Sequence, residues 1–79
     1  MDMTKLKEKR IGSGLSQNDL STISGVNIRT LQQYEQGSRN INGCNLKSLL
    51  RLCKALNCKV IDILDDPELI ELIKKADFN

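Results

Sequence analysis

A short polar segment, residues 28–36, holds the side chains best suited to reading nucleic-acid bases. The Arg29 guanidinium can donate two hydrogen bonds to guanine, and the amides of Gln32 and Gln33 can each pair with adenine. Ile28 can pack against a thymine methyl group. We predict that four residues contact bases: Ile28, Arg29, Gln32 and Gln33. The alternative for the two glutamines is that they only face solvent.

Polar groups on either side of the same segment suit the phosphate backbone. Gln17 opens a predicted helix, and a helix N-terminus attracts anions. Side chains within and just beyond the segment carry hydroxyl, amide and guanidinium donors, which bind phosphate oxygens and fix the register of a protein on a duplex. The predicted phosphate-contacting residues are Gln17, Thr30, Gln36, Ser38, Arg39 and Asn40. For Arg39 the alternative is an ordinary surface charge.

Charge is distributed unevenly along the 79 residues. Residues 1–60 carry ten Lys and Arg against four Asp and Glu, a net charge of +6, whereas residues 61–79 carry two against six, a net charge of −4. A basic body suits a polyanion such as nucleic acid, although charge alone is equally well explained as a solvated surface. The acidic tail is expected to face away from phosphate.

The elements that must position these side chains are two short helices with a tight turn, spanning about residues 16–37. Ser16 begins the first helix with a capping-box pattern, because an acid follows three residues later. Gly25 occupies the turn, where left-handed backbone is needed, Asn27 caps the second helix, and Gly37 ends it. This arrangement predicts a helix-turn-helix. The apolar residues expected to hold its helices together are Leu20, Ile23, Val26, Leu31 and Tyr34.

The remaining pattern predicts an all-α fold. Its core must be aliphatic, since the chain has one Tyr, one Phe and no Trp. A glycine-containing turn should end the first helix, with Asp2 or Thr4 as its cap, and Pro67 suits the first position of the last helix. The other expected helices span about residues 4–11, 45–56 and 60–64, with a polar loop at 38–44 and an amphipathic helix after residue 66.

Several function classes are excluded or disfavoured by what the chain lacks. It has no His, no Cys-x-x-Cys pair and no glycine-rich phosphate loop, so we expect no enzymatic activity, no metal site and no cofactor. Cys53 and Cys58 are expected to be core residues and Cys44 a loop thiol. With no long apolar run and no signal-peptide pattern, we expect no membrane partner and a cytoplasmic location.

The sequence resembles the Cro and phage-repressor type of helix-turn-helix domain, found in small bacterial and phage transcriptional regulators. The resemblance covers about residues 3–64. It rests on the motif Leu15-Ser16-Gln17-Asn18-Asp19-Leu20, on Gly25-Val26, Leu31 and Tyr34-Glu35-Gln36-Gly37, and on Leu49-Leu50 with Lys54-Ala55-Leu56-Asn57-Cys58. Departures from the family pattern are a longer loop after Gly37 without its common proline, Ser24 in place of an apolar residue, and Ile28 in place of a polar one.

The resemblance implies a five-helix DNA-binding domain at residues 1–64, here followed by an acidic amphipathic helix at 65–79. It implies a homodimer that binds a double-stranded DNA operator and represses transcription. It also implies that Gln17 contacts phosphate and that Arg10 pairs with Glu35 as a structural element. Two alternatives remain: an antitoxin that binds its operator and neutralises a toxin, and a protein-interaction module without DNA binding. The terminal helix is the expected surface for a second subunit or another protein partner.

Overall fold

The computed structural model describes residues 3–76, and every regular element in that range is helical. The α-helices are Lys5–Gly12 (α1), Gln17–Ser24 (α2), Ile28–Gln36 (α3), Leu46–Leu56 (α4) and Pro67–Lys75 (α5). Two short 3-10 turns, Ile41–Gly43 (η1) and Val60–Asp62 (η2), flank α4. The predicted all-α class is therefore confirmed. Within residues 3–76, no helix has both the length and the apolar character needed to span a bilayer.

Local side-chain caps set the helix-turn-helix. Ser16 Oγ accepts a hydrogen bond from the Asp19 amide at 3.0 Å, and the Asp19 carboxylate accepts one from the Ser16 amide at 3.1 Å, which completes the predicted capping box. The side chain of Asn27 caps α3 by accepting hydrogen bonds from the amides of Arg29 and Thr30. Gly25 and Gly37 end the two helices with φ values of +77° and +81°. Both glycines therefore adopt left-handed backbone, which side chains with a Cβ disfavour.

Caps also define the other helices. Thr4 caps α1, while Asp2, the other predicted cap, lies outside the described residues. Asn45 begins α4, and Asn57 ends it with a positive φ of 53°. Asp66 accepts hydrogen bonds from the first turn of α5, where proline occupies the first position as predicted.

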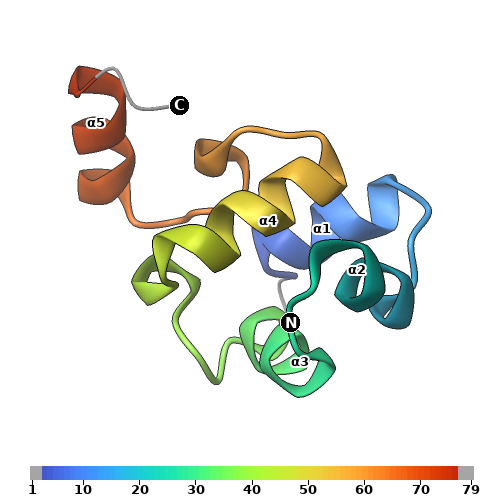
Figure 1. Cartoon of the computed structure of the whole chain (residues 1–79). Helices are drawn as coiled ribbons and strands as arrows, with labels where there is room; N and C mark the ends of the chain where they lie inside the picture. The colour runs from blue at the N-terminus through green and yellow to red at the C-terminus, as the bar shows by residue number, and fades with distance from the viewer. Residues whose placement is uncertain (1–2, 77–79) are drawn as a thin grey trace.

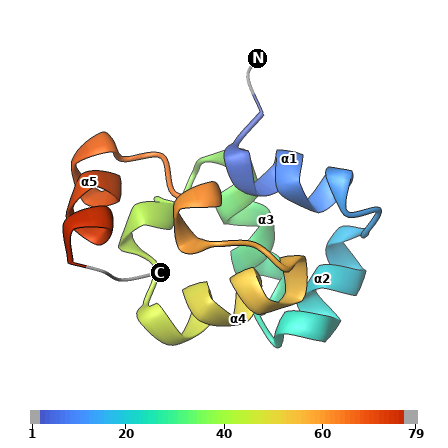
Figure 2. The same cartoon turned by 90° about the horizontal axis from the view of Figure 1, so that it is seen from above.

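The core lies where α4 crosses the helix-turn-helix and α1 (Figure 1). Its most completely buried side chains are aliphatic. They come from α1, α2, α3 and α4 and from the segment around η2. Figure 2 shows α5 at one end of the molecule and α2 at the other, with α3 between them. The fully buried residues are Leu6, Leu20, Leu31, Leu52, Val60, Ile63 and Leu64.

The prediction that Ile23 faces the core is wrong. Its side chain is 61% exposed, whereas Leu20 and Ser24 are buried. Residues four apart lie on the same side of a helix, and the side of α2 that carries Leu20 and Ser24 faces the neighbouring helices. Ser24 is accommodated because its hydroxyl accepts a hydrogen bond from the Val26 amide at 3.1 Å. A small polar residue therefore fills the place where α2 enters the turn.

The two connections around α4 differ from expectation. The segment at 38–44 is not only a loop, because η1 forms within it and buries Ile41. The segment at 60–64 forms the short turn η2 and not a full helix. Lys5 Nζ donates hydrogen bonds to the carbonyl oxygens of Ile61 and Leu64, at 2.8 and 2.6 Å. These contacts satisfy carbonyl groups that a longer helix would otherwise have used.

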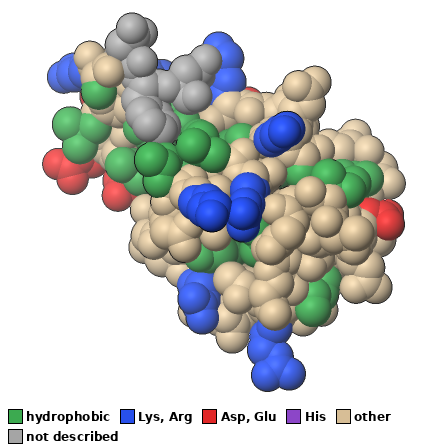
Figure 3. Space-filling view, in the orientation of Figure 1, with side chains coloured by type: hydrophobic (Ala, Val, Ile, Leu, Met, Phe, Trp, Pro, Cys, Tyr) green, Lys and Arg blue, Asp and Glu red, His purple; other side chains and the backbone are tan. Residues whose placement is uncertain are grey.

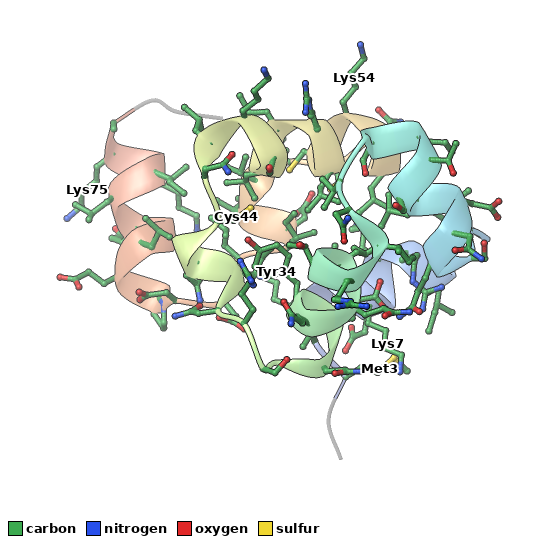
Figure 4. The ribbon with its side chains drawn as sticks, turned by 60° about the horizontal axis from the view of Figure 1, so that its bottom comes forward. Met3, Lys7, Tyr34, Cys44, Lys54 and Lys75 are labelled. Carbon is green, nitrogen blue, oxygen red and sulfur yellow. The ribbon has the colours of Figure 1, made fainter. Side chains whose placement is uncertain are left out.

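The cysteines are free thiols in the described structure. Cys53 is buried, as predicted, while Cys58 and Cys44 are half-buried at the margin of the core. Burial raises the pKa of the Cys53 thiol to about 12, with a smaller contribution from the neighbouring Cys58. Figure 4 shows Cys44 beside Tyr34, and burial, followed by a hydrogen bond with Cys44, raises the pKa of this tyrosine. Cys44 is therefore packed against an aromatic ring and is not a freely exposed loop thiol.

Candidate nucleic-acid interface

The outer face of α3 is polar along its whole length. Leu31, Tyr34 and Glu35 point inward and are buried. Arg29 and Gln36 are exposed, and the two glutamines between them, Gln32 and Gln33, are half-buried. These four positions follow the spacing i, i+3, i+4 and i+7, which places them on one face of a helix. The structure thus brings together three of the predicted base-reading side chains: Arg29, Gln32 and Gln33.

Ile28 lies differently from the other three. It is half-buried and packs against the hydrophobic core at the start of α3. Part of this side chain is therefore committed to the protein interior, and only the remainder can meet a base edge.

Glu35 anchors α3 from beneath. Its carboxylate accepts hydrogen bonds from Arg10, at 2.7 Å from Nε and 3.1 Å from Nη2. The Glu35 side chain is 1% exposed and that of Arg10 is 11% exposed. Arg10 Nη1 also donates to the Leu15 carbonyl oxygen at 2.8 Å. The two-point contact holds both charged groups in one geometry. It ties α1 and the start of α2 to the end of α3.

Gln17 extends this contact to the outer face. Its amide nitrogen donates to Glu35 Oε1 at 3.2 Å, and its amide oxygen accepts from Gln32 Nε2 at 3.4 Å. A continuous chain of hydrogen bonds thus runs from Arg10 through Glu35 and Gln17 to Gln32. We call these four residues the anchor network. Both ends of the Gln17 amide are engaged within the protein, which sequence reasoning did not foresee.

The segment after α3 folds back onto that helix. The Arg39 backbone amide and the Ser38 hydroxyl both donate to the Gln33 carbonyl oxygen, at 3.2 and 3.3 Å. Arg39 Nε donates to the Gln33 side-chain oxygen at 3.1 Å, and the guanidinium lies 5.9 Å from the centre of the Tyr34 ring. These contacts hold Arg39 beside the polar outer face of α3. Arg39 is therefore oriented by its neighbours.

The other predicted phosphate-contacting residues differ from one another in exposure and in their contacts. Asn40 is exposed, and its side-chain oxygen accepts from the Asn42 amide at 2.9 Å, which caps η1. Thr30 is half-buried and Gln36 is exposed. Asn42 in turn binds the chain before α5, because its side-chain nitrogen donates to Asp65 Oδ1 at 2.6 Å. The α3–α4 connection is thus held near the end of α3 and again at η1.

Sequence reasoning missed a row of basic residues on α4. Lys47, Arg51 and Lys54 are all exposed, and α4 contains no acidic residue. Their spacing of i, i+4 and i+7 is the signal that predicts a shared helix face. Figure 3 shows Lys and Arg side chains over the face that carries α4 and α3, with acidic side chains at its margins. Lys54 points away from α3 in Figure 4, so the basic surface extends beyond α3.

Comparison with known families agrees with this architecture. Residues 6–63 match a family model described as helix-turn-helix, a range that runs from the second residue of α1 to just beyond η2. Neither a curated protein nor a solved structure is similar enough to the chain to count as a match. The matched region contains the capped α2, the glycine turn, the outward-facing α3 and the anchor network. The chain therefore belongs to the Cro- and repressor-type helix-turn-helix family, whose members are DNA-binding transcription regulators.

Proposed function

We propose that this protein binds a specific double-stranded DNA operator as a symmetric dimer and represses transcription. The α3 helix enters the major groove and reads bases through Arg29, Gln32 and Gln33, with the exposed part of Ile28 available to a thymine methyl group. The observation that carries this proposal is the polar outer face of α3, supported from within by the anchor network. A surface held in place before binding loses less conformational entropy when it docks.

Phosphate contacts flank this face in the proposed complex. The N-terminus of α2 approaches one strand, and because the Gln17 amide is engaged with Glu35 and Gln32, the helix N-terminus itself supplies much of the attraction. On the other side, Arg39 keeps guanidinium N–H groups available beyond its bond to Gln33. Thr30, Gln36, Ser38 and Asn40 complete the proposed set.

The two proposed roles belong to consecutive segments of the chain. Residues 1–64 supply DNA binding, and the segment at 65–79 that contains α5 supplies contacts to protein. We infer a dimer because one recognition helix reads too few bases for useful selectivity. In this role the protein acts by binding alone, without a catalytic step.

Selection of binding sites from a random duplex pool tests this function. The purified protein is incubated with the pool at a low and a high salt concentration. We expect enrichment of a palindrome whose half-sites lie about 10–10.5 base pairs apart, centre to centre. Binding without an enriched motif, with a steep loss on adding salt, would show only nonspecific attraction to phosphate and would overturn the proposal.

A matched pair of variants sharpens the selection. Arg29→Ala removes a cation from the outer face of α3, and Lys54→Ala removes one that points away from α3. We expect the first variant to change the enriched motif at one position in each half-site. The second is expected to recover the wild-type motif. The opposite result would place the reading surface on α4.

A further inference from the structure

The C-terminal end of α4 is closed by two backbone hydrogen bonds. The Cys58 amide donates to the Cys53 carbonyl oxygen at 3.0 Å, and the Asn57 amide donates to the Lys54 carbonyl oxygen at 3.2 Å. Asn57 adopts left-handed backbone, with φ 53° and ψ 51°. This pair of bonds forms a Schellman motif, in which the side chains of the two residues joined by the longer-range bond commonly pack together. In this chain both of those side chains are thiols.

The two thiols interact directly in the folded chain. Burial raises the pKa of both Cys53 and Cys58, and a hydrogen bond between them raises the pKa of Cys53 further while it opposes the rise at Cys58. The third thiol, Cys44, instead forms a hydrogen bond with Tyr34. A disulfide needs its two Cα atoms about 4.4–6.8 Å apart and its side chains directed toward each other. Residues joined by a backbone bond and by a thiol contact meet these needs with little rearrangement.

Cys58 is the member of the pair that solvent reaches more easily. A surface hollow of about 710 Å³ is lined by both cysteines and by residues of the turn around them. Cys53 is only 6% exposed, whereas Cys58 is half-buried. The charges of Lys9 and Asp62 act on the Cys58 thiol in opposite directions, the lysine favouring the thiolate. A reagent in solvent therefore meets Cys58 before it meets Cys53.

We propose that Cys53 and Cys58 form a site of reversible oxidation, at which a low-molecular-weight disulfide converts the two thiols to an intramolecular disulfide. The new bond joins α4 to the chain that enters η2, and so it fixes the C-terminal end of α4. The site uses none of the residues of the proposed DNA-binding face. Its oxidation is therefore tested without DNA and does not depend on the proposed function.

The reaction consists of two successive thiol–disulfide exchanges. The Cys58 thiolate attacks one sulfur of the small disulfide, whose S–S bond breaks, so that a mixed disulfide forms at Cys58 and one small thiolate leaves. Cys53 then loses its proton and attacks Cys58 Sγ, which forms the intramolecular bond and releases the second small thiolate. The two protons lost by the protein are taken up by the two released thiolates. The protein is oxidised by two electrons, and the small disulfide is reduced by two.

The native fold favours this bond because it holds the two sulfur atoms together before the reaction. In the unfolded chain the same cysteines are separated by four residues, and their sulfur atoms sample many separations. A cross-link that forms more readily in the folded chain must stabilise the fold by the same factor, because the two equilibria belong to one thermodynamic cycle.

Equilibration with reduced and oxidised glutathione tests the proposal. The full chain is incubated at a series of ratios of the two forms, in buffer and in denaturing urea, and mass spectrometry of acid-quenched peptides identifies each disulfide. We expect the Cys53–Cys58 bond to form with an equilibrium constant larger by about tenfold or more in the folded chain, as a short loop closed without strain allows. A constant that is equal or smaller in the folded chain would overturn the proposal, and so would a cross-link that involves Cys44.

Single variants test where the reaction begins. Cys53→Ala leaves Cys58 without its partner, so Cys58 should accumulate as a mixed disulfide with glutathione. Cys58→Ala leaves the buried Cys53, which should stay reduced in the folded chain. Circular dichroism checks that both variants are folded. A mixed disulfide at Cys53 but not at Cys58 would contradict the order of the two exchanges.

The stability of the two forms provides a second readout. The oxidised and reduced chains are unfolded with urea, and circular dichroism follows the transition. The oxidised chain should unfold at the higher urea concentration, because the cross-link that the fold favours also stabilises it. Unfolding of the oxidised chain at a lower concentration than the reduced chain would overturn the proposal, since the bond would then strain the fold.

Discussion

The α3 and α5 helices are both nine residues long and both amphipathic, yet they relate to the rest of the molecule in opposite ways. The α3 helix buries Leu31, Tyr34 and Glu35 and leaves a polar face in solvent. The α5 helix buries no residue and leaves Leu72 more than half exposed. The apolar side of α3 is packed within the chain, and its other side presents hydrogen-bonding groups. The apolar side of α5 is only partly packed, and it leaves hydrocarbon exposed.

The two exposed faces suit different kinds of molecular surface. Amide and guanidinium groups on a fixed backbone bind a polar, charged target with little reorganisation, as the edges and phosphates of a duplex require. Exposed leucines gain free energy when they leave water and need only a complementary apolar surface. One small chain thus carries a polar helix face and an exposed apolar helix face on separate parts of its surface.

Removing the buried carboxylate of Glu35 should have the largest effect on stability. Glu35→Ala leaves the guanidinium of Arg10 without its partner in a nearly buried position. We expect a loss of about 3–5 kcal/mol in the free energy of unfolding, measured by chemical denaturation. The double variant Arg10→Met with Glu35→Leu removes both charges and should recover much of that loss. A single variant as stable as the wild type would show that the ion pair does not anchor α3.

A change on the outer face of α3 should leave stability intact and alter recognition. Arg29 is exposed, so Arg29→Ala is expected to unfold like the wild type. Binding to the selected operator should weaken by about 1–3 kcal/mol, and discrimination at one base pair should be lost. A panel of operators with single base changes measures this. An equal loss on every sequence would instead identify Arg29 as a phosphate contact.

Gln17 connects the buried Glu35 to Gln32 on the outer face of α3. Gln17→Ala should have a smaller effect on DNA binding. Loss of a hydrogen-bonding side chain is expected to cost about 0.5–1.5 kcal/mol. If Gln17 serves phosphate binding, the loss should be uniform across the operator panel. A selective loss at the base read by Gln32 would contradict the phosphate assignment. It would show that Gln17 acts by orienting that side chain through their 3.4 Å contact.

The smallest effect concerns the buried thiol of Cys53 in α4. Burial raises the pKa of the Cys53 thiol to about 12, so its thiolate is scarce at neutral pH. Alkylation of the folded protein by iodoacetamide should spare Cys53, while the denatured chain reacts at all three cysteines. Because the unfolded thiol ionises first, folding stability should decline as the pH rises from about 9 toward 12. Rapid modification of Cys53 in the folded protein at pH 7 would contradict this assignment.

The ends of α2, α3 and α4 and the position of the helix-turn-helix could be predicted from local sequence signals. Ser16, Asn27 and Asn45 cap helices through contacts that reach only two or three residues along the chain, and Gly25 and Gly37 end helices through their own backbone freedom. Such signals can be recognised in the sequence because both partners lie within one helical turn of each other along the chain. The predicted outward-facing residues of α3 follow from the same local periodicity.

The way those elements face one another depends on how the helices pack. Ile23 and Ser24 are adjacent, and only the packing of α2 against its neighbours makes the polar residue buried and the apolar one exposed. Gln17 reaches Gln32 and Glu35 across 15 and 18 residues, and Lys5 reaches Leu64 across 59. Contacts of that range depend on the relative placement of whole helices, which local periodicity does not specify. The same placement leaves the apolar face of α5 half uncovered.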